Sequence, residues 1–338
     1  MAQFCGTKQM NPPPPLRYPA RMTDTPLVIQ TPQGLFCPEG GFHIDPMGRV
    51  PRALITHGHS DHAARGMGAY LCTHQALPVI RHRLGKITAE GIAYGEARQI
   101  GGVSVSFHPA GHVPGSAQIR IERGGQVWVA SGDYKTAPDA LCEPFEAVRC
   151  HTFLTETTFG LPIFHWQSEA EVMGQIAAWW ASNAARGVAS VLLAYSFGKA
   201  QRLMAGLAGL GPICTHPVVE AVTDILRQQG YPLPPTLALT NASPPQGALV
   251  IATPNAMASA WALGLGPHTV AAASGWMALA ARRKGASAAF VLSDHADWAG
   301  LNAAVAATGA EQVFTLHGST GPFAAWLRSK GLSAQAMA

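Results

Sequence analysis

Four side chains of the kinds that bind metals lie within residues 57–62, which read His-Gly-His-Ser-Asp-His. His57 and His59 are two positions apart, so both imidazoles can point to one side of a frayed strand end. Asp61 and His62 lie past a turn and can face another direction, so one short loop could serve two ions. Imidazoles with a carboxylate suit Zn²⁺, Mn²⁺ or Fe²⁺. We therefore favour a metal site over an incidental cluster on a surface loop.

Further residues of the same kinds follow later predicted strands. His112 lies in a glycine-rich turn after the alternating segment 103–107. Asp133 ends the predicted strand 127–133, which follows a Gly-Gly hairpin signal, and its carboxylate could bridge two ions. A single strand-end His or Asp is more often a turn or cap residue, so only the combination indicates a metal centre. A dinuclear centre needs about three or four protein ligands for each ion.

With these residues in place, the chain resembles the metallo-β-lactamase fold hydrolases, whose His-x-His-x-Asp-His motif matches residues 57–62. It is similar in particular to the β-CASP branch of nucleic-acid-processing nucleases. Glu156, His295 and His317 correspond to motifs A, B and C of that branch. Within the branch, local sequences most resemble the bacterial DNA-ligase-associated exonuclease family, over roughly residues 27–328. The segments that carry this likeness are residues 45–46, 56–57, 131–135, 156–162 and 198–203.

The resemblance implies an α/β fold, the metallo-β-lactamase αββα sandwich with an inserted α/β (β-CASP) domain. We expect residues 1–22 to be a flexible leader, and residues 23–158 to be the first part of the metallo-β-lactamase domain. Residues 159–290 are then the β-CASP insert, and residues 291–338 the second part of the hydrolase domain.

The hydrophobic pattern agrees with this division, because residues 27–158 give mostly strands and the following block alternates helix with strand, as in a parallel α/β layer. Helices are predicted at 169–185, 199–209 and 218–229, and strands at 188–195, 248–252, 269–273, 289–293 and 312–316. Met173, Trp179 and Trp180 are expected on the core face of the first helix, with an aromatic platform for nucleobases as the alternative.

The resemblance also implies the ligand roles. One ion would be held by His57, His59 and His112, and the other by Asp61, His62 and His295, with Asp133 bridging. Two divalent ions are expected, zinc first, with manganese or iron as alternatives. A water between them would lose a proton and attack phosphorus. Asp61, Asp133, Glu156 and His317 are the expected catalytic residues.

Two carboxylates are expected to support the ligands, because ligating imidazoles normally donate their second N–H to an acceptor. Glu156 would orient a ligand histidine, and Asp45 would brace the histidine loop. His317 would contact the scissile phosphate or help to protonate the leaving oxygen. The alternative for His317 is a core histidine with its hydrogen bonds satisfied.

The net charge of +4 is mild, so any surface that binds phosphates must be local. The expected contacts with phosphates are Ser196, Lys199, Arg202 and Lys135, at a cleft between the two domains. The basic run 282–284 is a further candidate, with a solvated helix end as its alternative.

The expected function is a metal-dependent nuclease, a DNA exonuclease that acts on single-stranded DNA in repair together with an ATP-dependent DNA ligase and a helicase. A histidine at motif C is typical of RNA-processing members, so His317 keeps an RNA-processing β-CASP ribonuclease as an alternative. A small-molecule metallo-hydrolase such as a lactonase or thioesterase is a second alternative, and a non-catalytic binding subunit a third. The sequence assigns no oligomeric state.

Composition excludes several other classes. The chain has 338 residues, of which 48% are hydrophobic and 12% charged, so we expect a well-buried globular protein. Its six cysteines form no Cys-x-x-Cys pair, which argues against a zinc ribbon and a disulfide framework and favours the cytoplasm. No secretory signal is expected, and the weakly charged residues 246–281 suggest strands and helices rather than a membrane span.

Overall fold

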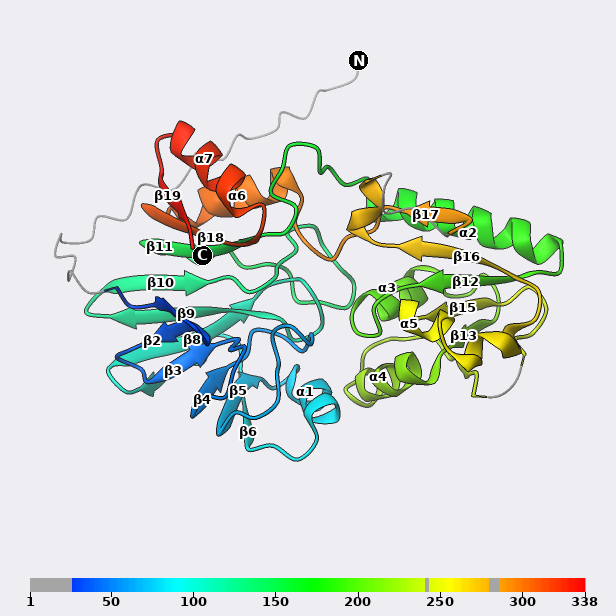
Figure 1. Ribbon diagram of the computed structural model, residues 1–338, viewed down its shortest axis with the longest axis horizontal. Coiled ribbons are helices and arrows are strands. Elements are labelled where there is room, and N and C mark those ends of the chain that lie inside the picture. The colour runs from blue at the N-terminus through cyan, green and yellow to red at the C-terminus, as the bar shows by residue number, and fades with distance from the viewer. Residues whose placement is uncertain (1–25, 241–242, 280–285, 338) are drawn as a thin grey trace, which may run out of the picture.

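The protein is described by a computed structural model over residues 26–240, 243–279 and 286–337. These residues form three β-sheets with helices between and around them, so the predicted mixed α/β class is confirmed (Figure 1). The expected leader at 1–22 and the basic run 282–284 lie outside the described residues. Within the described ranges, no helix combines the length and the hydrophobicity needed to cross a membrane. The five cysteines in these ranges are free thiols.

The first sheet has six strands in sequence order, of which β1 to β3 pair antiparallel and β3 to β6 pair parallel. They are β1 (Ile29–Thr31), β2 (Gly34–Cys37), β3 (Phe42–Ile44), β4 (Arg52–Leu54), β5 (Ala69–Thr73) and β6 (Ala89–Ile92). Helix α1 (Leu77–Leu84) joins β5 to β6 and packs on the outer face of this sheet, where Ile80 meets Ile55 and Tyr70.

The second sheet has seven strands in the order β19-β18-β11-β10-β9-β8-β7. They are β7 (Arg98–Ile100), β8 (Val103–Pro109), β9 (Ala117–Arg123), β10 (Gln126–Ala130), β11 (Thr152–Thr157), β18 (Gln312–Gly318) and β19 (Ser333–Ala336). Gly124 and Gly125 make the predicted hairpin between β9 and β10, with φ of 57° and 84°. A two-residue turn of this kind needs positive φ at both positions, which glycine adopts without strain.

The two sheets pack face to face and are covered by helices on their outer sides. Phe42 and Leu54 of the first sheet share a buried core with Phe107 and Ile119 of the second. Full burial of such side chains contributes about 1.5–3 kcal/mol each. Helices α6 (Trp298–Thr308) and α7 (Thr320–Ser329) cover the other face of the second sheet. The layers therefore run helix, sheet, sheet, helix (Figure 1).

The third sheet is entirely parallel, in the order β14-β13-β15-β12-β16-β17. Its strands are β12 (Ala189–Leu193), β13 (Ile213–Thr215), β14 (Leu237–Ala238), β15 (Leu249–Ala252), β16 (His268–Ala273) and β17 (Ala288–Phe290). The helices in this part are α2 (Glu169–Ala185), α3 (Lys199–Gly206), α4 (Pro217–Gln228) and α5 (Pro254–Met257), with the 3₁₀ turns η1 (Ala260–Leu265) and η2 (Gly275–Ala278). The alternation predicted for this block is confirmed.

Helix α2 matches its predicted bounds because Ser168 and Glu171 form a capping box at its start. Met173 and Trp180 are buried against the third sheet, which agrees with a core face rather than an aromatic platform. The predicted strand 289–293 is shorter than expected: β17 ends at Phe290, and the following residues turn towards the pocket described below.

The third sheet is inserted in the chain between two neighbouring strands of the second. Strands β11 and β18 pair directly in parallel, with Thr155 opposite Thr315, although every strand of the third sheet lies between them in sequence. Apolar side chains also join the two parts, where Val113 and Phe197 pack with Val222 of α4. The chain therefore leaves the four layers and returns at one edge, next to the site.

Candidate metal centre

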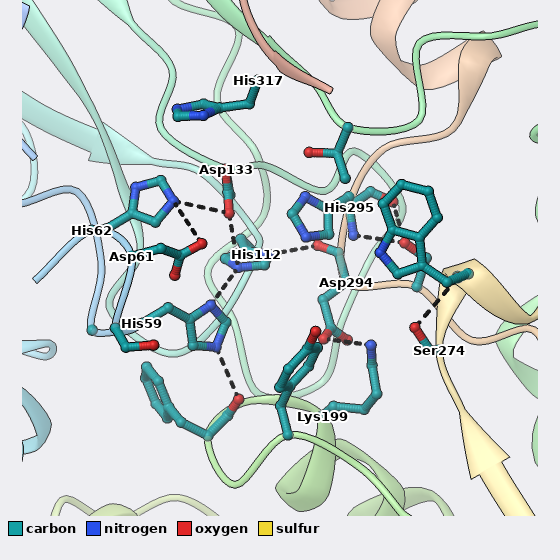
Figure 2. A pocket seen from close by; sticks show the side chains of 18 of the residues that line it. His59, Asp61, His62, His112, Asp133, Lys199, Ser274, Asp294, His295 and His317 are labelled. Atoms are coloured by element: carbon teal, nitrogen blue, oxygen red, sulfur yellow. Dashed lines mark hydrogen bonds and ion pairs between the residues drawn. The ribbon is translucent and has the colours of Figure 1, made fainter. Parts of the chain in front are cut away.

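The predicted site residues come together because the strands that carry them end at one edge. Strands β8, β10, β11 and β18 run in one direction in the second sheet, and β3 and β4 are parallel in the first. Asp45 follows β3, residues 57–62 follow β4, His112 follows β8, Asp133 follows β10, and Glu156 and His317 lie near the ends of β11 and β18. His295 arrives from the segment after β17 (Figure 2).

His57, His59 and His112, which we call the first group, point three ring nitrogens at one another. His59 Nδ1 is 3.1 Å from His57 Nε2 and 3.1 Å from His112 Nε2. Asp133 Oδ2 completes the set, 3.7 Å from His57 Nε2 and 3.8 Å from His112 Nε2. Ligand atoms around a tetrahedral zinc, at about 2.0–2.1 Å from the ion, lie roughly 3.3 Å apart. The spacing matches such a coordination shell.

The second nitrogen of each ring fixes which nitrogen carries the proton. His59 Nε2 donates to the Phe197 carbonyl at 3.1 Å, and His112 Nδ1 donates to the Asp294 carbonyl at 2.8 Å. The Thr56 hydroxyl gives its hydrogen to Asp45, so its oxygen accepts from His57 Nδ1 at 3.1 Å. A neutral imidazole has only one N–H. The three nitrogens that face one another therefore carry lone pairs and no proton.

Burial keeps these rings neutral. It lowers the pKa of His57 and His112 well below the ordinary value, and the nearby histidines lower both further. Burial also lowers the pKa of His59. Three lone pairs at 3.1 Å with no proton between them repel one another, and a cation at their centre removes that repulsion. The residues present thus fit a metal ion.

His62 and His295, the second group, also lie close to Asp133 (Figure 2). His62 Nδ1 donates to Asp45 at 2.8 Å, and its Nε2 is 3.3 Å from Asp133 Oδ2. His295 Nδ1 donates to Glu156 at 2.9 Å. The Nε2 atoms of both rings are thus left for a metal on the side of Asp133. Asp45 and Glu156, the two carboxylates expected to support ligands, thus accept the Nδ1 hydrogen bonds of this group.

Glu156 lies within a second cluster of ligand atoms, with Asp133 and His295. Its two oxygens also accept hydrogen bonds from the Tyr134 amide and the Thr158 hydroxyl. Because these oxygens already have partners, Glu156 fits better as a residue that orients His295 than as a metal ligand.

Asp61 lies farther from the other predicted ligands than the sequence suggested. Its side chain is 74% exposed, and its Oδ2 is 3.8 Å from His62 Nε2.

The charges of the second group differ from those of the first. Burial by itself would lower the pKa of His62, but Asp133 and Asp45 outweigh it and raise that pKa well above the ordinary value. In the same way Glu156 and Asp133 overcome burial and raise the pKa of His295 to about 9. Burial opposes ionisation of Asp133, yet the two histidines hold its pKa well below the ordinary value. Without a metal, protons supply the positive charge here.

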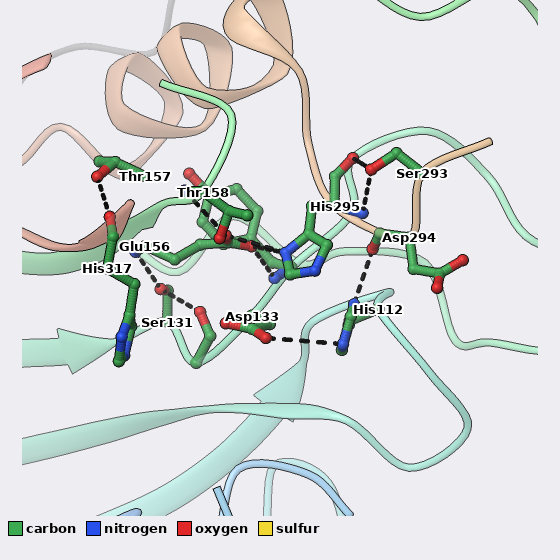
Figure 3. Close-up of polar contacts among 12 residues, drawn as sticks. His112, Ser131, Asp133, Glu156, Thr157, Thr158, Ser293, Asp294, His295 and His317 are labelled. Carbon is green, nitrogen blue, oxygen red and sulfur yellow. Dashed lines mark hydrogen bonds and ion pairs between the residues drawn. The ribbon is translucent and has the colours of Figure 1, made fainter. Parts of the chain in front are cut away.

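His317 is exposed, so the alternative of a core histidine is wrong. Its ring lies 5.7 Å from that of His62, and its backbone has a φ of 52°. A non-glycine residue in this region costs about 1–3 kcal/mol and is found most often at functional sites. The Thr157 hydroxyl anchors the strained turn by donating to the His317 carbonyl (Figure 3).

Two cavities meet at this centre. The larger, of about 520 Å³, lies between the four layers and the third-sheet part and is lined by His59, His62, His112, His295 and His317 (Figure 2). Arg83, Tyr195, Ser196 and Trp276 line it as well. A second cavity of about 260 Å³ lies beyond His62 and shares Asp61, His62 and His317 with the first. The two cavities therefore adjoin at these three residues.

The basic residues expected to hold phosphates are placed differently from the prediction. Lys135 and Arg202 are buried, with 4% and 6% exposure, and neither lines the larger cavity. Both contact Asp139, at 3.4 and 3.2 Å. Lys199 does line the cavity, but its Nζ is 3.0 Å from Asp294 Oδ2. The carboxylates of Asp139 and Asp294 therefore neutralise these cations within the protein. The sequence did not indicate this, because the partners lie on segments that only the fold brings together.

The sequence analysis missed Arg83, which lines the larger cavity from the last turn of α1. Its Nη1 donates to the Gly58 carbonyl, and among the described residues no carboxylate oxygen lies within 4.0 Å of its guanidinium. Its position in a helix that carries other basic residues gives no signal of this placement. Asp294 was also missed, although it directly precedes His295.

Comparisons with known proteins find a relative in sequence and a solved structure of similar fold. No family model matches the chain. The chain is 33% identical over 319 residues to a protein named probable DNA ligase from Opitutus terrae, in an alignment that covers 92% of this chain. It spans only 31% of the length of that relative. A crystal structure of a protein of unknown function from Enterococcus faecalis V583 is similar with a TM-score of 0.56 at 12% identity, covering 78% of this chain and 75% of that one, a likeness of fold alone.

Proposed function

We propose that this protein is a metal-dependent phosphodiesterase that degrades DNA, a member of the ligase-associated branch of the β-CASP nucleases. The observation that carries the proposal is the convergence of three unprotonated ring nitrogens on Asp133, which only a cation reconciles. The relative named probable DNA ligase supports the link to DNA and to a ligase. A helicase as a further partner comes from the family resemblance alone.

The layers support the fold part of the proposal. A helix–sheet–sheet–helix arrangement with a third sheet inserted before β18 is what the metallo-β-lactamase sandwich and its β-CASP insert imply. We accordingly propose 23–158 and 291–338 as the two parts of the hydrolase domain, and 159–290 as the insert.

We propose two ions that share Asp133. The first group would hold one ion, and His62, His295 and Asp61 would hold the other. This mixture of imidazole and carboxylate donors suits zinc, with manganese or iron as alternatives. Such ions lower the pKa of water and offset the charge of a phosphate group.

The side chains around the ions would do the remaining work. Asp45 and Glu156 hold the rings of His62 and His295 in one orientation. His317, exposed where the two cavities meet, would hydrogen-bond a phosphate oxygen or protonate the leaving oxygen.

The two cavities support a polymeric substrate, because a strand must continue on both sides of the bond that breaks. Ser196 and Arg83 line the larger cavity and would contact phosphates, a role that Arg83 takes over from Lys135 and Arg202. Tyr195 is 58% exposed at the same cavity, and its ring would offer a face for stacking a base. A lactone or thioester would need none of these features.

An RNA substrate is the second candidate, since the exposed His317 stands at the motif position where RNA-processing members carry histidine. The deciding experiment incubates the purified protein with 5′- and 3′-labelled single-stranded DNA and matched RNA, with Zn²⁺ or Mn²⁺. A chromogenic phosphodiester, a lactone and a thioester are assayed in parallel. We expect metal-dependent cleavage of DNA and of the phosphodiester. Cleavage of RNA alone, or of the lactone or thioester alone, would contradict the proposal.

Asp61→Ala is the matched inactive variant. The Asp61 side chain is 74% exposed, so its removal should leave folding intact and abolish hydrolysis. Hydrolysis by this variant at the wild-type rate would remove Asp61 from the centre.

The contact with phosphate is tested by Arg83→Met. The KM for DNA should rise, because the variant lacks a cation that contacts phosphate. The slope of log KM against log salt concentration should decrease by about one, as expected for the loss of one phosphate contact. Arg81→Met, on the same helix but outside the larger cavity, should change neither.

A further inference from the structure

We infer that Lys199 and Arg202 are positioning residues of the metal centre, through which helix α3 fixes the ligands His112 and His295. The inference rests on the metal centre of the proposed function. It replaces the role in phosphate binding that the sequence suggested for these two cations.

The two cations bind the short segment Ser293–Asp294, which precedes His295, through ion pairs and a hydrogen bond. Asp294 is 3% exposed, and its two oxygens each lie 3.0 Å from a cation, Oδ2 from Lys199 Nζ and Oδ1 from Arg202 Nη1. Arg202 Nη1 also donates to the Ser293 carbonyl at 2.7 Å. Both residues before His295 are thus fixed, one by its side chain and one by its backbone.

The segment Ser293–Asp294 in turn orients the ligands His112 and His295. The Asp294 carbonyl accepts from His112 Nδ1 at 2.8 Å, which turns the bare Nε2 of that ring towards the first group (Figure 3). His295 follows Asp294 directly in the chain. A shift of this backbone would therefore move His295 and release His112.

The same helix reaches a third ligand. Phe197, two residues before Lys199, accepts from His59 Nε2 at 3.1 Å through its carbonyl. Gln201 holds this turn, because its side chain accepts from the Gly198 amide and donates to the Ser196 carbonyl. The start of α3 therefore touches both sides of the centre.

The charges explain why these cations do not serve phosphates. Arg202 also contacts Glu169 at 2.6 Å and Asp139 at 3.2 Å, and Lys135 contacts the same two carboxylates. Lys135, Lys199 and Arg202 thus face Asp139, Glu169 and Asp294, so their formal charges cancel. Removing one partner of a buried ion pair leaves the other uncompensated, which favours a shifted backbone.

A positioning role predicts a particular pattern of defects. Loss of either cation should weaken metal binding and lower kcat, because His112 and His295 lose their fixed orientation. KM for DNA and its dependence on salt should stay unchanged, because both cations are buried and paired with Asp294, even though Lys199 lies in the wall of the larger cavity. A phosphate contact would give the opposite pattern.

The experiment compares Lys199→Met and Arg202→Met with the wild type, since methionine keeps length and removes charge. Co²⁺ binding to the full chain is followed by visible absorption, and kcat, KM and the salt slope are measured on single-stranded DNA. We expect metal affinity to fall about 10–100-fold in each variant. Unchanged metal affinity with a raised KM and a smaller salt slope would overturn the inference.

Controls separate positioning from loss of folding. Arg227→Met removes an arginine that is ion-paired with Glu220 and Asp224 on α4, away from the centre, and should leave metal affinity unchanged. Should a methionine variant fail to fold, Asp294→Asn tests the same grip from the other side and should also weaken Co²⁺ binding. A wild-type protein that binds no Co²⁺ would overturn the proposed function as well. One that binds Co²⁺ but cleaves no DNA would leave the positioning test valid.

Discussion

The two histidine groups around Asp133 face the same carboxylate but differ in what holds their outer nitrogens. In the first group these nitrogens donate to uncharged acceptors, two carbonyls and a hydroxyl, and burial keeps the rings neutral. In the second group they donate to the carboxylates Asp45 and Glu156, which raise the pKa of both rings. The charge of the acceptor at the outer nitrogen thus decides whether the ring, in the absence of metal, is neutral or protonated.

Removal of metal should give the largest effect and separate the groups. A chelator should abolish hydrolysis, and Zn²⁺ or Mn²⁺ should restore it. The ion of the second group should leave first, because a proton on His295, with its pKa of about 9, costs a competing metal roughly 3 kcal/mol at pH 7. Metal content measured along a chelator titration should fall in two steps. Loss of all metal in one step would mean that the groups do not differ.

Asp133→Asn should remove the shared ligand and damage both groups together. We expect metal affinity to fall by more than about 100-fold, which exceeds the effect of losing a bracing residue. Isothermal titration with Zn²⁺ measures this. Asp224→Asn, which alters an exposed carboxylate on α4, is the control and should bind metal normally. Retention of one tight ion in Asp133→Asn would show that the first group binds without the carboxylate.

Asp45→Asn and Glu156→Gln should weaken the second group selectively. Each substitution removes the charge that orients His62 or His295, so affinity for the weaker ion should fall about 10–100-fold. The tighter ion should be nearly unaffected, which metal titration can resolve. Glu146→Gln alters a similar pair, with His108 at 3.0 Å, that does not line either cavity, and serves as the control. Equal weakening of both ions would contradict the distinction.

The dependence of metal affinity on pH should give the smallest effect, counted for a change of one pH unit. His295 binds a proton below its pKa of about 9, so this ring alone should lower the affinity for the second ion up to tenfold for each pH unit below that value, and the raised pKa of His62 acts in the same direction. Titrations in buffers of different ionisation enthalpy should show proton release for the second ion and little for the first. In the metal-free protein the sign is reversed. The stability contributed by the raised pKa is complete below 6.5 and is lost as pH rises through about 9, which melting temperatures can follow.

Much of the fold could be predicted from local pattern. Helix α2 matched its expected bounds because its apolar face and its capping box are both local, and the alternation of the third-sheet part was visible for the same reason. The short strands β13 and β14, of three and two residues, were not predicted. Segments of that length carry too little periodicity, and only their neighbours in the sheet make them strands.

The sequence by itself determined which side chains can bind a metal, since ligand chemistry belongs to residue type and the strand-end spacing of His57 and His59 is local. Tertiary structure decided which nitrogen of each ring is free. The acceptor of His59 lies 138 positions away, and that of His112 lies 182 positions away. It also turned Lys199 and Arg202 towards carboxylates instead of a substrate. A cation pairs with the nearest opposite charge, and which charge is nearest depends on the tertiary structure and not on separation along the sequence.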